Sequence, residues 1–169
     1  MMSKTTLKYL TNILFFAVIL YLIVQRVPGI LEAHKRQGEL APPAEVTSLE
    51  GERLTIPLQK KHVLVFWATW CGPCGVELAR INRLVKNGAL APDSVLAISI
   101  GEAKATVEAH MKEHGYLFRA ALDPGGRAGR EYQVAGTPTI LLVREDGIVE
   151  WMTVGVSPTL ELRLHRFFN

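Results

Sequence analysis

Two cysteines could carry chemistry in this chain, and they stand three positions apart. Cys71 and Cys74 lie in the segment Trp70-Cys71-Gly72-Pro73-Cys74, and the 169 residues contain no other cysteine. Such a pair closes a tight ring when oxidised and lies beside its own resolving thiol when reduced, which suits redox cycling. It offers too few ligands for a closed zinc site, which needs about four. Two inert buried thiols, or half of a metal site, are the alternatives.

The elements on either side of the cysteines suggest how one thiol could react near neutral pH. Residues 62–68 form a continuous apolar run that predicts a central strand buried on both faces. Apolar residues recur at helical spacing after the cysteines, and Asn87-Gly88 favours a stop. The helix therefore begins at Cys71, where the helix dipole and free N–H groups favour a thiolate. Cys71 is predicted to attack and Cys74, one turn further, to resolve the mixed disulfide.

Strand and helix patterns alternate along the rest of the chain. Two short strands flank a turn at residues 49–54, and a strand at 94–100 and a helix at 104–114 follow the cysteine helix. A turn at 123–126 leads into a short helix. A hairpin over 139–154 and a terminal helix opened by Ser157-Pro158 complete the order βαβ followed by ββα. The fold class is α/β, a central mixed β-sheet flanked by helices with an N-terminal β-hairpin.

An uncharged apolar stretch near the N-terminus has the composition of a membrane anchor. The segment 9–27 approaches the ~20 residues of a single transmembrane helix. Its apolar core is longer than the roughly 7–15 residues of a signal peptide, and no Ala-x-Ala-like site follows. We predict a cytoplasmic tail at 1–8, an uncleaved single-pass inner-membrane anchor at 9–27 and a linker at 28–44. The folded domain at 45–169 then faces the periplasm.

Two separate motifs resemble those of known proteins. Residues 66–74 are similar to the active-site segment of thioredoxin-like proteins, and residues 136–139 are similar to their cis-proline loop. Over residues 45–169 the chain resembles the TlpA/ResA family of membrane-anchored periplasmic thiol-disulfide oxidoreductases. The resemblance implies a thioredoxin fold, a cis peptide bond before Pro138, and a substrate strand that pairs with the backbone of Thr137 beside the dithiol.

One departure from the resemblance concerns the proton of the resolving thiol. Thioredoxin has a buried aspartate where this chain has Val65, so that acceptor is missing. Glu77 matches a glutamate near the dithiol of ResA-like proteins, and helical spacing places it on the Cys74 side. Glu77 is predicted to shuttle the Cys74 proton, with a solvated first-turn glutamate as the alternative. Trp70 is predicted to shield the dithiol and to offer an apolar contact to substrate.

Metal, cofactor and nucleic-acid sites are not expected. His110 and His114 have the spacing of two metal ligands, but Met111 replaces the glutamate of a metalloprotease and the residues follow a packing stripe. The net charge of +3 is spread among mixed acidic and basic residues, so no basic patch suggests a nucleic acid. The dithiol is therefore expected to work without a cofactor.

The dipeptide between the cysteines bears on the direction of electron flow. Gly72-Pro73 is the dipeptide of thioredoxin, whose potential is about −270 mV against about −120 mV for the oxidant DsbA, so reduction of disulfides in partner proteins is favoured. The resemblance implies a membrane electron donor of the DsbD type and a role in cytochrome c maturation. Residues 154–156 are similar to ScsD-like proteins, which would imply copper tolerance. A periplasmic dithiol oxidase and a Cu(I)-binding module using Cys71 and Cys74 are the alternatives.

Overall fold

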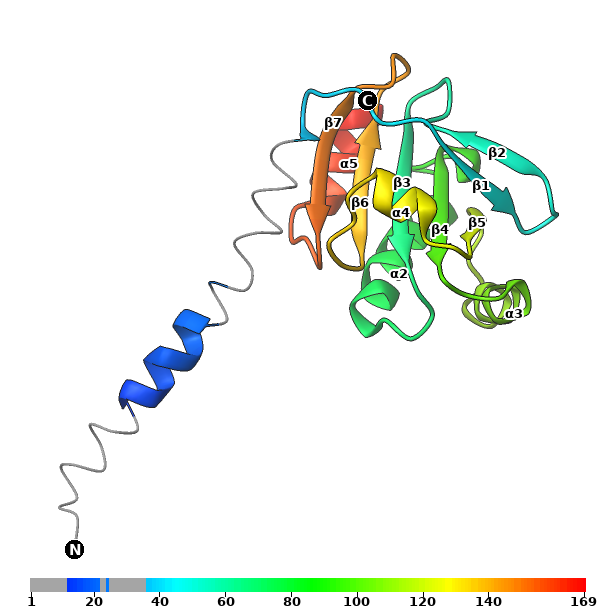
Figure 1. Ribbon diagram of the computed structural model, residues 1–169. Coiled ribbons are helices and arrows are strands. Elements are labelled where there is room, and N and C mark those ends of the chain that lie inside the picture. Colours follow the sequence, from blue (N-terminus) through cyan, green and yellow to red (C-terminus); the bar gives the residue numbers. More distant parts are fainter. Residues whose placement is uncertain (1–11, 22–23, 25–35) are drawn as a thin grey trace, which may run out of the picture.

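The folded part of the chain is a seven-stranded mixed sheet with helices on both faces. The computed structural model describes residues 12–21, 24 and 36–169. The strands run in the spatial order β2-β1-β5-β4-β3-β6-β7 (Figure 1). They are β1 (Ala44–Ser48), β2 (Arg53–Ile56), β3 (His62–Trp67), β4 (Val95–Ile100), β5 (Arg119–Asp123), β6 (Thr139–Val143) and β7 (Val149–Val154). The helices of this part are α2 (Gly72–Lys86), α3 (Lys104–His114), α4 (Arg127–Glu131) and α5 (Leu160–Phe168), with a 3-10 turn at Pro92–Ser94.

Strand β3 lies inside the sheet, as its apolar run predicts. It pairs in parallel with β4 and antiparallel with β6, and all of its residues are buried. Because side chains alternate along a strand, Val65 and Trp67 face one hydrophobic cluster while Leu64 and Phe66 face the other. A strand of this kind is held from both sides, so its carboxyl end is a rigid place from which to position the cysteines.

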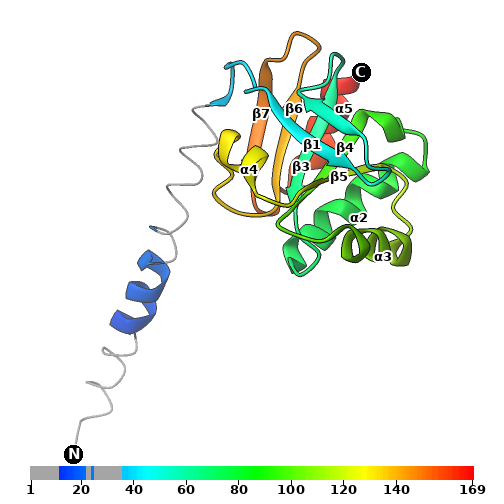
Figure 2. The same ribbon diagram turned by 45° about the vertical axis from the view of Figure 1, so that its right-hand side comes forward.

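Three helices cover one face of the sheet and the short α4 covers the other (Figures 1 and 2). Leu78 of α2, Val107 of α3 and Leu160 of α5 belong to the first cluster. On the opposite face Tyr132, at the end of α4, packs against Phe66 with ring centroids 5.2 Å apart. The apolar periodicity of each helix therefore faces the sheet.

Two elements differ from the sequence prediction. Strand β5 is not predicted, because the alanines at its centre have a low preference for strands. Helix α5 begins at Leu160 after Thr159, not directly at Ser157-Pro158. The residues before it form a loop that bonds to α2, and these contacts hold the chain out of helical geometry until Thr159.

The last part of the predicted linker at 28–44 is bonded to the sheet. The N–H of Gly38 donates to the carbonyl of Val149 at 2.8 Å, and the N–H of Ala41 donates to the carbonyl of Gly147 at 2.9 Å. β7 is an edge strand, and these bonds satisfy backbone groups that would otherwise lack a partner in the sheet. Contacts with the folded domain therefore begin before residue 45.

The predicted tail at 1–8 and part of the predicted anchor at 9–27 lie outside the described residues. Residues 12–21 are helical. In the part of the chain that the structure describes, no helix combines the length and the apolarity that a membrane crossing requires.

His62, at the start of β3, is a fully buried histidine with a partner on each ring nitrogen. Nδ1 lies 2.7 Å from the Lys60 carbonyl and Nε2 lies 3.3 Å from the Leu58 N–H. A carbonyl only accepts and an N–H only donates, so the neutral ring must carry its hydrogen on Nδ1. Burial lowers the pKa of His62, because desolvation of the charged ring outweighs the Lys60 carbonyl bond.

The lowered pKa of His62 makes stability depend on pH. Since the folded state disfavours the protonated ring, the unfolded state binds the proton first, and stability is lost as the pH falls below about 6.5. From about pH 7.5 to about pH 5.5, the parent should lose about 1 kcal/mol of unfolding free energy more than His62→Gln does. Urea unfolding of the full chain at both pH values measures the difference.

An exposed histidine on α5 provides the control for this measurement. His165→Gln should keep the pH dependence of the parent. Equal pH slopes in the parent and in His62→Gln would contradict the assignment.

Candidate active site

The cysteine motif forms the first turn of α2, as predicted. Cys71 is the N-cap residue in an extended conformation, and Pro73 lies at the second helical position, where a missing N–H does no harm. The N–H of Cys74 donates to the carbonyl of Cys71 at 2.9 Å and approaches its Sγ at 3.3 Å. The two cysteines form a disulfide, with their Cα atoms 5.2 Å apart.

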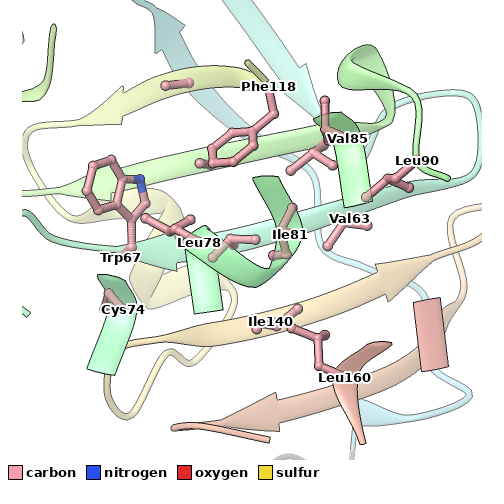
Figure 3. Close-up of a cluster of buried hydrophobic side chains, with 14 of the residues drawn as sticks. Val63, Trp67, Cys74, Leu78, Ile81, Val85, Leu90, Phe118, Ile140 and Leu160 are labelled. Atoms are coloured by element: carbon pink, nitrogen blue, oxygen red, sulfur yellow. The ribbon is translucent and has the colours of Figure 1, made fainter. Parts of the chain in front are cut away.

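The two sulfurs differ in their access to solvent. Cys71 is 7% exposed and Cys74 is fully buried. Figure 3 shows Cys74 at one end of the cluster that contains Trp67, Leu78 and Ile81. An incoming partner can therefore reach Cys71 before it can reach Cys74.

The Thr137-Pro138 loop lies against Cys71. The Sγ of Cys71 is 3.5 Å from the carbonyl oxygen of Thr137, and the peptide bond between Thr137 and Pro138 is cis. β6, which follows this loop, pairs with β3, so both segments meet at the same end of the sheet. The N–H of Gly155 donates to the Pro138 carbonyl at 2.7 Å and holds the loop from the other side. The sulfur thus faces a backbone carbonyl that is fixed in position.

Several apolar side chains of α2 and of the segments before it and after β7 are exposed. Trp70, directly before Cys71, is 78% exposed. Val76 on α2 and Val156 in the loop after β7 are about half exposed. The residue after Val156, Ser157, bonds to Glu77 of α2, so the loop after β7 is held against this helix.

Glu77 is buried, and the alternative of a solvated first-turn glutamate is wrong. Its side chain is fully buried in the second turn of α2. It accepts the N–H of Ser157 at 2.5 Å and pairs with Arg80 at 3.2 Å. Among the described residues, no hydrogen bond joins its carboxylate to the sulfur of Cys74. The role of Glu77 as a proton shuttle stays a prediction.

Glu102 is a site residue that the sequence reasoning missed. Its carboxylate accepts the Thr69 N–H at 2.9 Å, the Thr69 hydroxyl at 2.5 Å and the Ser99 hydroxyl at 2.6 Å. Burial acts to raise the pKa of Glu102, but the bonds from Ser99 and Thr69 together hold it below its ordinary value. β3 and β4 are parallel neighbours, so residues after β4 meet residues after β3 at one edge. The acidic residue just after the predicted strand at 94–100 was the signal that could have located it.

The two histidines on α3 take part in ring packing. His110 stacks on His114 with centroids 4.1 Å apart, and its ring lies 5.3 Å from that of Trp67. Within the described ranges no cluster of three or more His, Cys, Asp or Glu is arranged to hold a metal ion. Burial lowers the pKa of His110, and the nearby His114 lowers it further.

The sheet order, the disulfide at the start of α2 and the facing proline loop define a thioredoxin-fold thiol-disulfide protein. Comparison with known proteins agrees with this class. Residues 36–164 match the Redoxin family model. The chain is 31% identical over 154 residues to thiol-disulfide oxidoreductase ResA of Bacillus thuringiensis (strain Al Hakam), covering 85% of this chain and 89% of that protein.

Two further similarities come from Bacillus subtilis. The chain is 27% identical over 158 residues to sporulation thiol-disulfide oxidoreductase A of strain 168, covering 90% of this chain and 94% of that protein. The crystal structure of StoA is similar with a TM-score of 0.60 and 26% identity, covering 77% of this chain and 98% of that one. The chain belongs to the redoxin family. Its expected TlpA/ResA-like character is confirmed.

Removal of the Glu102 charge should loosen the residue before the cysteines. In Glu102→Gln the amide oxygen can keep the bonds from the Thr69 N–H and the Ser99 hydroxyl, and the NH2 can donate to the Thr69 hydroxyl, so the bonds remain but lose their charged acceptor. We expect a loss of about 1 kcal/mol in the free energy of unfolding, because hydrogen bonds to a charged group are stronger than those to a neutral amide. Urea unfolding of the oxidised full chain measures it.

Glu108→Gln is the matched control, since Glu108 is an exposed glutamate of α3 paired with Lys104 at 3.4 Å. It should change stability by less than about 0.5 kcal/mol. A loss of similar size in both variants would contradict the prediction that the Glu102 hydrogen bonds stabilise the fold more than an exposed ion pair does.

Proposed function

We propose that this thiol-disulfide oxidoreductase acts as a reductant of disulfides in partner proteins. The observation that carries the proposal is the position of Cys71. Its sulfur lies at the start of α2, within 3.3 Å of a backbone N–H, and is the more exposed of the pair. The N-terminus of a helix favours a thiolate, and a thiolate is the form that attacks a disulfide.

In the reduced protein, the Cys71 thiolate attacks one sulfur of the partner's disulfide. A new bond forms between Cys71 and the partner, and the partner's other sulfur leaves with the electron pair. The Cys74 sulfur then attacks Cys71, which frees the partner's second thiol and leaves the Cys71–Cys74 disulfide. The close approach of the two residues on one helical turn supports this order of events.

Glu77 is the proposed acceptor of the Cys74 proton. Cys74 is fully buried, so its proton has no direct route to bulk water. Glu77 is three residues further along the same helix, on a neighbouring part of the helix surface, and is itself buried. A buried carboxylate one helical turn from the sulfur would remove the proton as the new disulfide forms.

The Thr137-Pro138 loop and Trp70 are the proposed contacts for substrate. The carbonyl of Thr137 is already beside the Cys71 sulfur, and Thr137 is partly exposed, so an extended chain could pair with it. Trp70 would add apolar contact next to the reacting sulfur. Recognition through backbone groups and one aromatic ring suits partners of varied sequence.

Several finer features belong to the same proposal. A reductant in an oxidising compartment must be recharged, so a membrane donor of the DsbD type would reduce the Cys71–Cys74 disulfide. Attachment through the anchor at 9–27, with 28–44 as linker and 45–169 in the periplasm, would place the domain near such a donor. The exposed apolar side chains of the helix at 12–21, among them Phe15 and Phe16, support the anchor.

The alternatives use the same cysteines. A dithiol oxidase would need the same arrangement with a higher reduction potential, so the potential decides between the two directions. A Cu(I) module would need the dithiol to stay reduced, and the Thr137-Pro138 loop would have no purpose in it. Links to cytochrome c maturation or to copper tolerance remain predictions of the sequence.

The reduction potential of the Cys71–Cys74 couple tests the direction. We expect the full chain, equilibrated with a dithiol buffer in detergent, to show a potential near or below about −220 mV. A potential near about −120 mV would instead make the protein an oxidant.

Variants of the two cysteines test their separate roles. Reduced Cys74→Ser should accumulate a stable adduct with one glutathionyl group when mixed with glutathione disulfide, because no second thiol resolves it. Cys71→Ser should form no adduct over the same time, because Cys74 is buried. Mass spectrometry of the full chain reads both. An adduct on Cys74 in the second variant would reverse the assignment.

A further inference from the structure

The Glu77 carboxylate is enclosed in a small ring of contacts that contains one cation. Arg80 Nη1 lies 3.2 and 3.4 Å from the two carboxylate oxygens. The same nitrogen donates to the Ser157 carbonyl at 2.8 Å, while the Ser157 N–H donates to Glu77 at 2.5 Å. One guanidinium thus binds both the carboxylate and the loop that covers it.

The charges around this ring alternate from the interior to the surface. Arg80 Nε also lies 3.3 Å from Glu161 of α5, which in turn is 3.2 Å from Arg83. The side chains become more exposed along this line, from 0% for Glu77 and 20% for Arg80 to 65% for Arg83. Arg80 is the one cation within ion-pair distance of Glu77 among the described residues.

The groups that face Glu77 are therefore few. Arg80 comes from the same helix, the loop contributes backbone of Ser157, and Glu161 reaches the site through Arg80. Cys74 is one turn before Glu77 on α2. A buried carboxylate without a counter-charge is strongly disfavoured, and an adjacent guanidinium favours its ionised form. An acceptor of the Cys74 proton must be ionised before the proton arrives.

We propose that Arg80 is a positioning residue for the resolving step, which holds Glu77 ionised and fixed so that it can take the Cys74 proton. The inference rests on the proposed role of Glu77. In this step the Cys74 sulfur bonds to Cys71, the bond between Cys71 and the substrate sulfur breaks, and the substrate thiolate leaves with the electron pair. The proton moves from Cys74 to Glu77 and then to water.

A coloured aromatic disulfide in excess separates the two halves of the reaction in the reduced full chain. Attack by Cys71 releases one aromatic thiolate, and resolution by Cys74 releases a second. In the parent, the second release should slow at acid pH as its proton acceptor is lost. In Arg80→Gln this slowing should set in at higher pH, and at acid pH the second release should be about tenfold slower than in the parent, because the carboxylate has lost its neighbouring cation.

Other variants give the controls. Arg83→Gln removes an arginine that touches Glu161 and leaves Glu77 untouched, so both releases should stay within about twofold of the parent. Arg80→Lys keeps the positive charge, so the pH dependence of its second release should lie close to that of the parent. A pH dependence in Arg80→Gln that coincides with that of the parent would overturn the proposal.

Different results are expected if the proposed roles of Glu77 and Cys74 are themselves wrong. If Glu77→Gln leaves the second release of the parent unchanged, Glu77 is not the acceptor, whatever Arg80 does. If the parent releases a single equivalent, Cys74 does not resolve the mixed disulfide. The first release, which depends on Cys71, reports that each variant is folded.

Loss of folding in Arg80→Gln would itself be informative. The double variant Glu77→Gln/Arg80→Gln leaves neither charge without its partner, and its recovery would show that an uncompensated carboxylate caused the failure. A double variant that also fails to fold would overturn the proposal, because Arg80 would then act through its own packing.

Discussion

The start of α2 at Cys71 is the constraint on which the rest of the site depends. A helix usually has a serine, threonine or acidic side chain as its cap, whereas here the Cys71 sulfur lies in that position. The reactive atom and the capping atom are therefore the same. Because β3 is buried on both faces, the core determines where the helix begins. The burial of Cys74 one turn later, and hence the unequal access to the two sulfurs, follows from that starting point.

Two carboxylates, one on each side of this helix start, bind neighbouring segments of the chain. Their partners differ in kind. Glu102 is surrounded by hydroxyl and N–H donors and fixes Thr69, just before the cysteines. Glu77 is matched by a cation and joins α2 to the loop after β7. The same loop also bonds to Pro138. It therefore contacts both the Thr137-Pro138 loop beside Cys71 and the part of α2 that follows Cys74. The site is a set of loops held by ionic and backbone contacts around a rigid sheet.

The sequence predicted what depends on local pattern. The apolar run of β3 and the helical spacing after Cys74 carry their own signals, so these two elements and the dithiol between them could be predicted, whereas β5 could not. The contacts of Glu102 and Arg80 could not, because they depend on the register of parallel strands and on the packing of α2 against a distant loop. The bonds of Gly38 to β7 and of Ala41 to the turn before it involve backbone alone, so they leave no pattern of side chains.

The pairing of residues 38–41 with the sheet has a consequence for how a partner can approach the disulfide. The bonds lie near the turn between β6 and β7, whereas Thr139 of β6 pairs with Phe66 close to the cysteines. The attachment is therefore at the opposite end of the sheet from the disulfide. The chain thus joins the sheet at one end of β6 and β7, and the disulfide lies at the other. A partner that docks at Cys71 therefore approaches the end of the sheet that points away from this attachment.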